Sequence, residues 1–309
     1  MNKVAFCFPG QGSFEAGMGR DFAEAVPAAM EVFRRGSAAS GLDLERLCFH
    51  AEAEELLDTA VQQPALVATS LAVLAALRDR GVKADFVIGH SVGEFAALAA
   101  AEAMTLEEAM ALVRERGLAM ADAAARNPGS MAAILGLADE VVEGLCRKIL
   151  GVWPANYNCP GQIVVSGEVD GVERAMALAK EAGAKLTVRL NVSGAFHSPL
   201  MESASGGLAE ALDGASFSDP HFAVYANVNG EPVLKASRAR ELLLQQLACP
   251  VRWTEEIRAL ASRYPDALYV EMGPGKVLVG LVKKIAPSLK TVTCGTAAEV
   301  QQLRDMPVS

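Results

Sequence analysis

Positive charge is scarce in this sequence: it has 28 Lys and Arg residues against 37 Asp and Glu residues, a formal net charge of −9 at pH 7. Proteins that bind nucleic acid need a basic stripe or patch to neutralise phosphates, so the acidic balance argues against such a partner. A long apolar leader is lacking too. The first apolar run, Val4–Phe8, is too short for a signal peptide or a membrane span. We therefore expect a cytoplasmic globular protein with no membrane partner.

Cysteine pairs and metal-ligand patterns are also lacking. The six cysteines are scattered without a C-x-x-C pair, and no cluster of His, Cys and carboxylate residues has metal-ligand spacing. In a chain that is not exported, such cysteines are expected to be reduced and mostly buried. Residues 273–276 lack the spacing of a P-loop, and residues 10–12 lack the third glycine of a dinucleotide fingerprint. The sequence thus predicts no metal and no nucleotide cofactor.

The most informative stretch is Gly-His-Ser-Val-Gly at residues 89–93. It follows the apolar run 86–88 and precedes a run of strong helix formers at 94–103. Between a strand and a helix, G-x-S-x-G is typical of a nucleophile elbow, a turn so tight that small residues must flank the serine. The helix N-terminus there favours an oxyanion. We predict that Ser91 is a covalent nucleophile.

A simpler interpretation makes Ser91 only the N-cap of the following helix. Glu94, three residues later, would then complete a capping box. We expect Glu94 to have that structural role. A cap alone would not need a glycine on each side of the serine, so the elbow interpretation is favoured.

Strands and helices alternate along the chain. The run Val4–Phe8, an apolar helix expected at residues 63–77 and a strand expected at 86–88 indicate a mainly parallel sheet covered on both faces. With 309 residues and 51% hydrophobic content, the chain can bury a large core in one or two domains.

Near residue 127 the pattern changes. The elements expected from there are strand 131–135, helix 140–150, extended segment 152–158, strand 163–166, helix 172–182 and strand 185–190. This βαββαβ order is that of a ferredoxin-like unit. We therefore predict an α/β protein whose larger domain, residues 1–126 and 196–309, is interrupted by an inserted ferredoxin-like domain, residues 127–195.

A serine nucleophile needs a base, and the chain has only four histidines. His90 lies inside the elbow, where neighbouring side chains point in different directions, so we interpret it as structural. His50 and His221 have polar, loop-like surroundings and no other signal. His197 lies where the inserted unit returns to the larger domain, a junction where ligand sites concentrate, so we predict it as the base. No acidic residue presents itself as its partner, and a backbone carbonyl could orient the ring.

Arg116 falls on the apolar face of an expected helix. Ala109, Leu112, Val113 and Met120 share this face by their helical spacing. A buried guanidinium without a partner is strongly destabilising. Two partners remain open: a carboxylate of the protein itself, or a substrate carboxylate held by the bidentate fork of arginine.

These residues belong to a larger set of motifs that occur in order over about residues 3 to 294. The set resembles the acyltransferase family of fatty acid and polyketide synthesis, in particular the malonyl-CoA:acyl carrier protein transacylases. The motifs are FPGQGS at 8–13, GHSVGE at 89–94, RG at 116–117, NYNCPGQ at 156–162, AFHSPLM at 195–201, QL at 246–247, PVRW at 250–253 and EMGPGKVL at 271–278.

The resemblance implies a role for each matching position. Ser91 would take the acyl group and His197 would be the general base, with its ring held by the backbone carbonyl of Gln246. Gln11 and the backbone N–H of Val92 would form the oxyanion hole. The resemblance also implies that the larger domain is α/β-hydrolase-like and that the site lies in the groove between it and the insertion.

The same resemblance bears on the choice of acyl group. Arg116 would hold the free malonyl carboxylate. Phe196 before the histidine and the aliphatic Val92 after the serine favour malonyl over methylmalonyl, because a bulky ring occupies the space that an α-methyl group needs.

The implied activity is transfer of a malonyl group from malonyl-CoA to the phosphopantetheine thiol of acyl carrier protein in fatty acid biosynthesis, through a malonyl-serine in a ping-pong reaction. Acyl carrier protein is then the partner, no cofactor is needed besides the two substrates, and we expect a monomer. A trans-acting acyltransferase of a polyketide synthase would share every motif. A serine hydrolase or thioesterase is disfavoured by Arg116 and by the missing triad acid.

Overall fold

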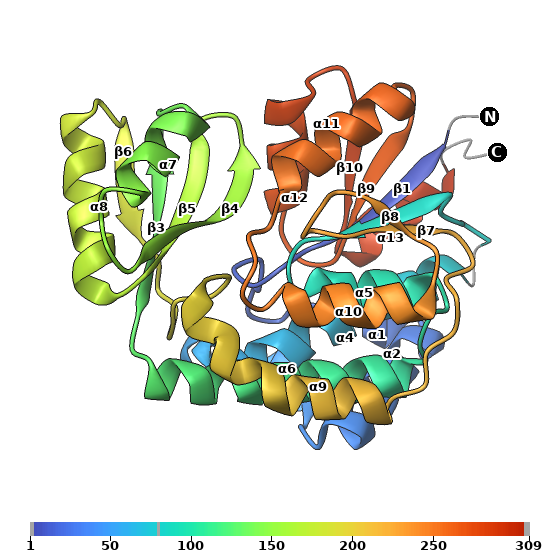
Figure 1. The fold of residues 1–309 in the computed structure, drawn as a ribbon. Coiled ribbons are helices and arrows are strands. Elements are labelled where there is room, and N and C mark those ends of the chain that lie inside the picture. Colours follow the sequence, from blue (N-terminus) through green and yellow to red (C-terminus); the bar gives the residue numbers. More distant parts are fainter. Residues whose placement is uncertain (1–2, 79–80, 306–309) are drawn as a thin grey trace.

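The computed structural model describes residues 3–78 and 81–305. Two β-sheets of different kinds lie side by side in it (Figure 1). The larger has the strand order β10-β9-β1-β2-β7-β8, in which only β8 runs antiparallel to its neighbour. Its strands are β1 Val4–Phe8, β2 Phe86–Gly89, β7 Ala223–Tyr225, β8 Pro232–Val233, β9 Leu268–Met272 and β10 Lys290–Cys294.

Both faces of this sheet are buried, as expected for parallel strands without polar alternation. Along β1, Phe6 and Phe8 face the core that contains α4 and α5, which contact this sheet, and α2 and α6, which pack behind them, whereas Ala5 and Cys7 face the core that contains α11 and α12. The helices that surround the larger sheet are α1 Arg20–Ala25, α2 Pro27–Ser40, α3 Leu44–His50, α4 Thr59–Arg78, α5 Gly93–Ala100, α6 Leu106–Arg126, α9 Ser205–Gly214, α10 Ala236–Gln245, α11 Trp253–Arg263, α12 Val277–Ile285 and α13 Ala297–Asp305. Two 3₁₀ turns, Ala53–Leu57 and Pro199–Ala204, accompany them.

The second sheet is antiparallel, with the order β4-β5-β3-β6. It comprises β3 Ser130–Leu135, β4 Val152–Cys159, β5 Gln162–Gly167 and β6 Leu186–Arg189, and the helices α7 Asp139–Cys146 and α8 Val169–Glu181 share its core. This connectivity and order are those of a ferredoxin-like unit. The predicted α/β fold with an additional ferredoxin-like unit is therefore confirmed. The domain limits at residues 127 and 195 stay a prediction.

The edge strand β4 joins the small sheet to the rest of the molecule. The main-chain N–H of Tyr157 donates to the carbonyl of Val251 (2.9 Å), and the N–H of Val251 donates to the carbonyl of Ala155 (2.8 Å). An edge that would otherwise expose unpaired backbone groups is thus covered by the segment that precedes α11. These bonds fix the small sheet beside the carboxyl ends of β1 and β2.

Helix α4 begins four residues earlier than the sequence indicates. Pro64 has no N–H, so it leaves the carbonyl of Ala60 without its helical donor. Arg114 from α6 donates to that carbonyl at 2.7 Å and so allows the helix to continue through the proline. Among the described residues, α4 is the one helix long and apolar enough to cross a membrane, and 89% of that stretch is buried in the protein. Its apolar character therefore serves the core.

The glycines of the elbow permit a close approach of backbones. A Cβ at residue 93 would lie 2.2 Å from the carbonyl oxygen of Phe8, and a Cβ at residue 89 would lie 2.2 Å from the carbonyl carbon of Gly93. Backbone atoms cannot move away by changing a rotamer. The start of α5 must therefore stay free of a side chain at both positions.

We expect Gly93→Ala to lower the free energy of unfolding by about 2 kcal/mol or more, the usual effect of forced overpacking, and to lower the reactivity of the predicted nucleophile Ser91. Denaturant unfolding and intact-protein mass spectrometry measure the two effects. Gly206→Ala in α9 is the control, because its Cβ meets no heavy atom within 4 Å, and it should be neutral or stabilising by up to about 1 kcal/mol. If Gly93→Ala behaves like Gly206→Ala, the elbow does not need this close approach.

Candidate active site

Ser91 lies between β2 and α5 in a left-handed backbone conformation. Its φ is +53°, and His197 has a similar φ of +56°. Such values are rare for residues with a side chain and concentrate at functional sites. Both residues line a cavity of about 270 Å³ between the two sheets, together with Gln11, Asn156 and Phe196.

A chain of two hydrogen bonds connects Ser91 to the backbone of Gln246, the residue that caps the C-terminus of α10. Ser91 Oγ lies 2.7 Å from His197 Nε2, and His197 Nδ1 lies 2.8 Å from the carbonyl oxygen of Gln246. A carbonyl can only accept, so Nδ1 carries the proton and Nε2 of the neutral ring is free to accept the serine proton. The structure thus brings Ser91, His197 and the Gln246 carbonyl together in the order that proton transfer requires.

His197 is kept neutral by its surroundings. Burial lowers the pKa of His197 to about 3, and the positive charge of Arg116 lowers it as well, while the hydrogen bond to the Gln246 carbonyl acts in the opposite direction. A neutral imidazole is the form that can accept a proton. His197 can therefore accept a proton over a wide pH range.

Arg116 is fully buried on α6, on the same face as Ala109, Leu112, Val113 and Met120. The predicted helix face is confirmed.

The hydrogen-bond partners of the Arg116 guanidinium are all oxygen atoms of neutral groups. Nη1 donates to Gln63 Oε1 (2.6 Å), and Nη2 donates to Gln246 Oε1 (2.9 Å) and to Ser91 Oγ (3.2 Å). Arg116 forms no ion pair with any carboxylate in residues 3–78 and 81–305. Burial lowers the pKa of Arg116 to about 10, so it remains charged at neutral pH. A buried cation beside the serine thus has no anionic partner.

Gln11 lines the same cavity as Ser91, and Val92 follows the serine directly in the chain. Gln11 Nε2 donates to Thr59 Oγ1 at 3.2 Å. Val92 is the N-cap of α5, and its N–H has no acceptor among the described residues, whereas those of Gly93 and Glu94 donate to the carbonyls of His90 and Ser91. A free N–H at a helix N-terminus can stabilise an oxyanion.

The capping-box role expected of Glu94 is wrong. Helix α5 begins at Gly93 without a side-chain cap. Glu94 is instead buried behind the serine, where it accepts hydrogen bonds from the N–H of Asn227 and from Gln246 Nε2. Burial raises the pKa of Glu94 to about 8. Hydrogen bonds to Asn227 and Gln246, which are distant in the sequence, hold the Glu94 side chain in the interior, so it does not cap the helix.

His90 has more contact with the site than its sequence position indicates. Its side chain lines the same cavity as Ser91 and points to Asn158 of β4, with 2.9 Å between Nε2 and Asn158 Oδ1. It forms no hydrogen bond with Ser91 in the part of the chain that the structure describes. His90 therefore links the elbow to the small sheet, and His197 is the histidine that contacts the serine.

Two residues of the site were missed from the sequence. Gln63 opens a run that the sequence predicts to be an apolar helix. A glutamine buried in such a helix needs a polar partner, and this need is a signal of its role. Asn227 lies in an Asn-Val-Asn-Gly stretch typical of a turn, and no local pattern separates it from an ordinary loop residue. Its contacts are with residues 89 to 94, far away in the sequence.

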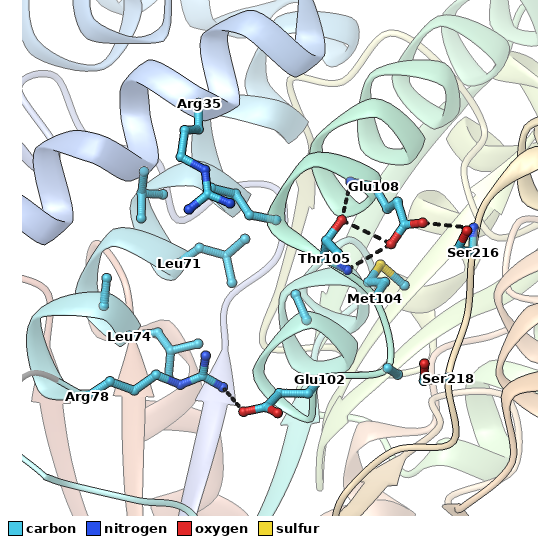
Figure 2. Close-up of a pocket in the computed structure, with 15 residues that line it drawn as sticks. Arg35, Leu71, Leu74, Arg78, Glu102, Met104, Thr105, Glu108, Ser216 and Ser218 are labelled. Carbon is cyan, nitrogen blue, oxygen red and sulfur yellow. Dashed lines mark hydrogen bonds and ion pairs between the residues drawn. The ribbon is translucent and has the colours of Figure 1, made fainter.

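A larger cavity, about 660 Å³, lies elsewhere, between α2, α4 and the beginning of α6 (Figure 2). Its arginines are neutralised: Arg78 pairs with Glu102 at 3.4 Å, and Arg35 pairs with Glu107 at 2.7 Å. None of its described lining residues is His or Cys. The cavity at Ser91 is therefore the candidate active site.

An α/β fold with a serine bonded to a neutral histidine is typical of enzymes that form an acyl-serine intermediate. Comparison with known proteins narrows this class. The chain belongs to the acyl transferase domain family, whose model matches residues 5–302.

The relatives are alike over nearly their whole lengths. A malonyl CoA-acyl carrier protein transacylase of Bacillus subtilis is 44% identical over 296 residues, 94% of this chain and 93% of that protein. The solved malonyl-CoA:acyl carrier protein transacylase of Xanthomonas oryzae is 40% identical, with a TM-score of 0.94 over 99% of this chain and 98% of that one. A malonyl-transacylase solved in complex with its type II polyketide synthase acyl carrier protein is 37% identical, with a TM-score of 0.94 over 97% of this chain and 98% of that one.

We expect kcat/KM for acylation by malonyl-CoA to stay within about twofold between about pH 7.5 and about pH 5, because kcat/KM reports the free enzyme and burial and Arg116 keep His197 neutral. A histidine with an ordinary pKa of about 6.5 would lose about thirtyfold at the lower pH. Quenched-flow acylation followed by intact-protein mass spectrometry measures the profile. An acid limb centred near pH 6.5 would contradict the neutral, buried base.

The same depressed pKa links stability to pH. Between about pH 6.5 and about pH 3 the unfolded chain protonates this histidine and the folded chain does not. His197 therefore lowers the free energy of unfolding progressively as the pH falls through that interval.

Proposed function

We propose that this chain transfers a malonyl group from malonyl-CoA to the phosphopantetheine thiol of acyl carrier protein in fatty acid biosynthesis, through a malonyl-Ser91 intermediate. One observation carries the proposal: Ser91 Oγ contacts His197 Nε2 at 2.7 Å and Arg116 Nη2 at 3.2 Å. The first group can accept the serine proton, and the second can bind a carboxylate beside the reacting atom. An acyl group that ends in a carboxylate matches both.

The first half-reaction acylates the serine. His197 Nε2 takes the hydroxyl proton as Ser91 Oγ attacks the thioester carbonyl, and the Nδ1–H bond to Gln246 holds the resulting imidazolium. The N–H of Val92 and the side chain of Gln11 stabilise the tetrahedral oxyanion. When the intermediate collapses, the C–S bond breaks and the coenzyme A thiolate takes the proton from Nε2. A malonyl ester of Ser91 and free coenzyme A result.

The second half-reaction uses the same atoms in the opposite direction. The phosphopantetheine thiol gives its proton to His197 Nε2, and its sulfur attacks the ester carbonyl. The C–O bond to Ser91 breaks, and Oγ recovers the proton from Nε2. The resting state returns with the malonyl group now a thioester of the carrier, and no redox agent or metal is needed.

Arg116 gives the acyl choice its physical basis. A charged guanidinium that is bonded only to neutral groups gains most from an anion, because a charge-assisted pair is strong where water is excluded. The aromatic ring of Phe196 lines the same cavity and supports a preference for malonyl over methylmalonyl.

The carrier protein is the proposed partner, and the relative solved with a carrier supports it. That carrier serves a type II polyketide synthase, so a trans-acting acyltransferase for polyketide synthesis is the second candidate. The choice between the two depends on which carrier accepts the malonyl group faster. A monomer in the cytoplasm remains our expectation for the assembly and its location.

We expect Ser91→Ala to abolish malonyl-enzyme formation and to leave the fold intact, since only the attacking oxygen is removed. Intact-protein mass spectrometry after mixing with malonyl-CoA detects the added acyl group, and addition of phosphopantetheinylated carrier should then remove it from the unchanged enzyme. Ser193→Ala is a matched control, because this hydroxyl contacts Thr59 Oγ1 rather than His197. Malonylation of the Ser91→Ala protein at another residue would overturn the assignment.

We expect Arg116→Ala to lower malonyl transfer by roughly two or more orders of magnitude, because a bidentate charge-assisted pair is worth a few kcal/mol and each 1.4 kcal/mol is about tenfold. Acetyl transfer has no carboxylate to lose and should fall much less. The ratio of the two rates is the observable, since a folding defect lowers both equally. Arg126→Ala at the end of the same helix is the control, because that arginine is exposed and, among the described residues, pairs only with Asp122. A parallel loss of both activities would make Arg116 a purely structural residue.

A further inference from the structure

We propose that Asn227 is the positioning residue that holds the nucleophile elbow in its reactive geometry, an inference that rests on acyl transfer at Ser91. Its side-chain amide bridges the two ends of the turn. The N–H of Ser91 donates to Asn227 Oδ1 at 2.6 Å, and Asn227 Nδ2 donates to the carbonyl of Gly89 at 2.7 Å. Asn227 is fully buried.

The Asn227 side chain supplies hydrogen bonds at a place where the neighbouring strand has already ended. β7 is the parallel neighbour of β2, and their register ends at the pair Ile88 and Tyr225. Beyond this pair the chain after β7 turns away, with the N–H of Gly230 donating to the carbonyl of Ala226. In the described part of the chain, no main-chain hydrogen bond joins residues 226–230 to residues 89–93. One acceptor and one donor from the Asn227 side chain take the place of the two ladder bonds that a continued strand would supply.

This bridge acts on the strained residue itself. With a φ of +53°, Ser91 persists in the left-handed region only because its surroundings determine it. A bond to its N–H fixes the plane of the peptide that precedes Ser91, and that plane and φ together set the direction of the Cα–Cβ bond. The 2.7 Å contact between Ser91 Oγ and His197 Nε2 depends on this direction.

Asn227 is itself held from three sides. Its N–H donates to the carboxyl group of Glu94, its carbonyl accepts from the N–H of Arg252 at 2.9 Å, and its Nδ2 also donates to Glu256 Oε2 at 3.1 Å. Both protons of Nδ2 and the Oδ1 atom are therefore used. A flipped amide would place N–H groups against the N–H of Ser91, so only one orientation is allowed.

Asn227→Ala removes the bridge but keeps the main-chain bond to Glu94. We expect the acylation rate at saturating malonyl-CoA to fall by about 100-fold, on the scale of a misplaced reacting group, whereas KM for malonyl-CoA changes less than about threefold because Arg116 keeps its bonds to Gln63 and Gln246. Reaction of Ser91 with phenylmethanesulfonyl fluoride, which carries no carboxylate and no coenzyme A, should slow by a similar factor. Asn229→Ala is the matched control, since that amide on the same loop bonds to Glu231.

Asn227→Asp tests the role without a change of shape. The new carboxyl group keeps an acceptor for the N–H of Ser91, and when protonated it can also donate to Gly89 or Glu256. Its neighbours are the carboxyl groups of Glu94 on α5 and Glu256 on α11, with the Arg116 guanidinium beyond Glu94. We expect acylation within about tenfold of the unchanged enzyme near pH 6, falling as the pH rises and the carboxyl group ionises.

Three results would overturn the inference: an Asn227→Ala enzyme that acylates at the normal rate, a rise in KM with an unchanged rate, or equal losses in the Ala and Asp variants at every pH. If Asn227→Ala does not fold, the pH profile of Asn227→Asp decides. The proposed function is tested separately. An unchanged enzyme that reacts with the sulfonyl fluoride but not with malonyl-CoA refutes malonyl transfer, while a slower sulfonyl fluoride reaction in the variants still supports the role of Asn227.

Discussion

The chain must pass from β2 into α5 within three residues, and this requirement places Ser91 in a left-handed conformation that its neighbours have to maintain. Gly89 and Gly93 allow the two backbones to approach within distances that no Cβ tolerates. Asn227 supplies the hydrogen bonds that the sheet cannot. The turn presents one hydroxyl group to the cavity, and this hydroxyl contacts His197. Most of the larger domain packs around the segment that presents it.

The second constraint is electrostatic. Arg116 is buried, charged and bonded to oxygen atoms of Gln63, Gln246 and Ser91. The acidic group that acts on its charge is Glu94, and burial raises the pKa of Glu94 to about 8, so that it is mainly protonated at neutral pH. The free enzyme therefore carries an unneutralised positive charge beside its nucleophile. Desolvating a charge in this way is unfavourable for folding. Binding of an anionic acyl group would account for a buried charge at this place.

Sequence patterns predicted what is local or periodic. The elbow at Ser91, the buried face that contains Arg116 and the βαββαβ order of the small unit all follow from short-range patterns, and the resemblance placed the Gln246 carbonyl at the histidine. The roles of Glu94 and Asn227 could not be predicted in this way. Their partners lie more than 130 residues apart, and the local signals of a capping box and an Asn-Gly turn pointed to ordinary structural roles. Buried polar networks are built by tertiary contacts, which a single sequence does not display.

The two constraints meet at His197, the proposed base. Burial is the main cause of its low pKa and the charge of Arg116 is the second, so the histidine of the free enzyme is neutral but weakly basic. In the proposed complex, a malonyl carboxylate on Arg116 would neutralise that charge and remove its effect on the ring, so His197 would become more basic while the acyl group is bound, although burial would still lower its pKa. The proposed carboxylate would then do more than select the acyl group: by the same ion pair it would strengthen the base that activates Ser91, so an acyl group that carries a carboxylate would react faster than one that lacks it.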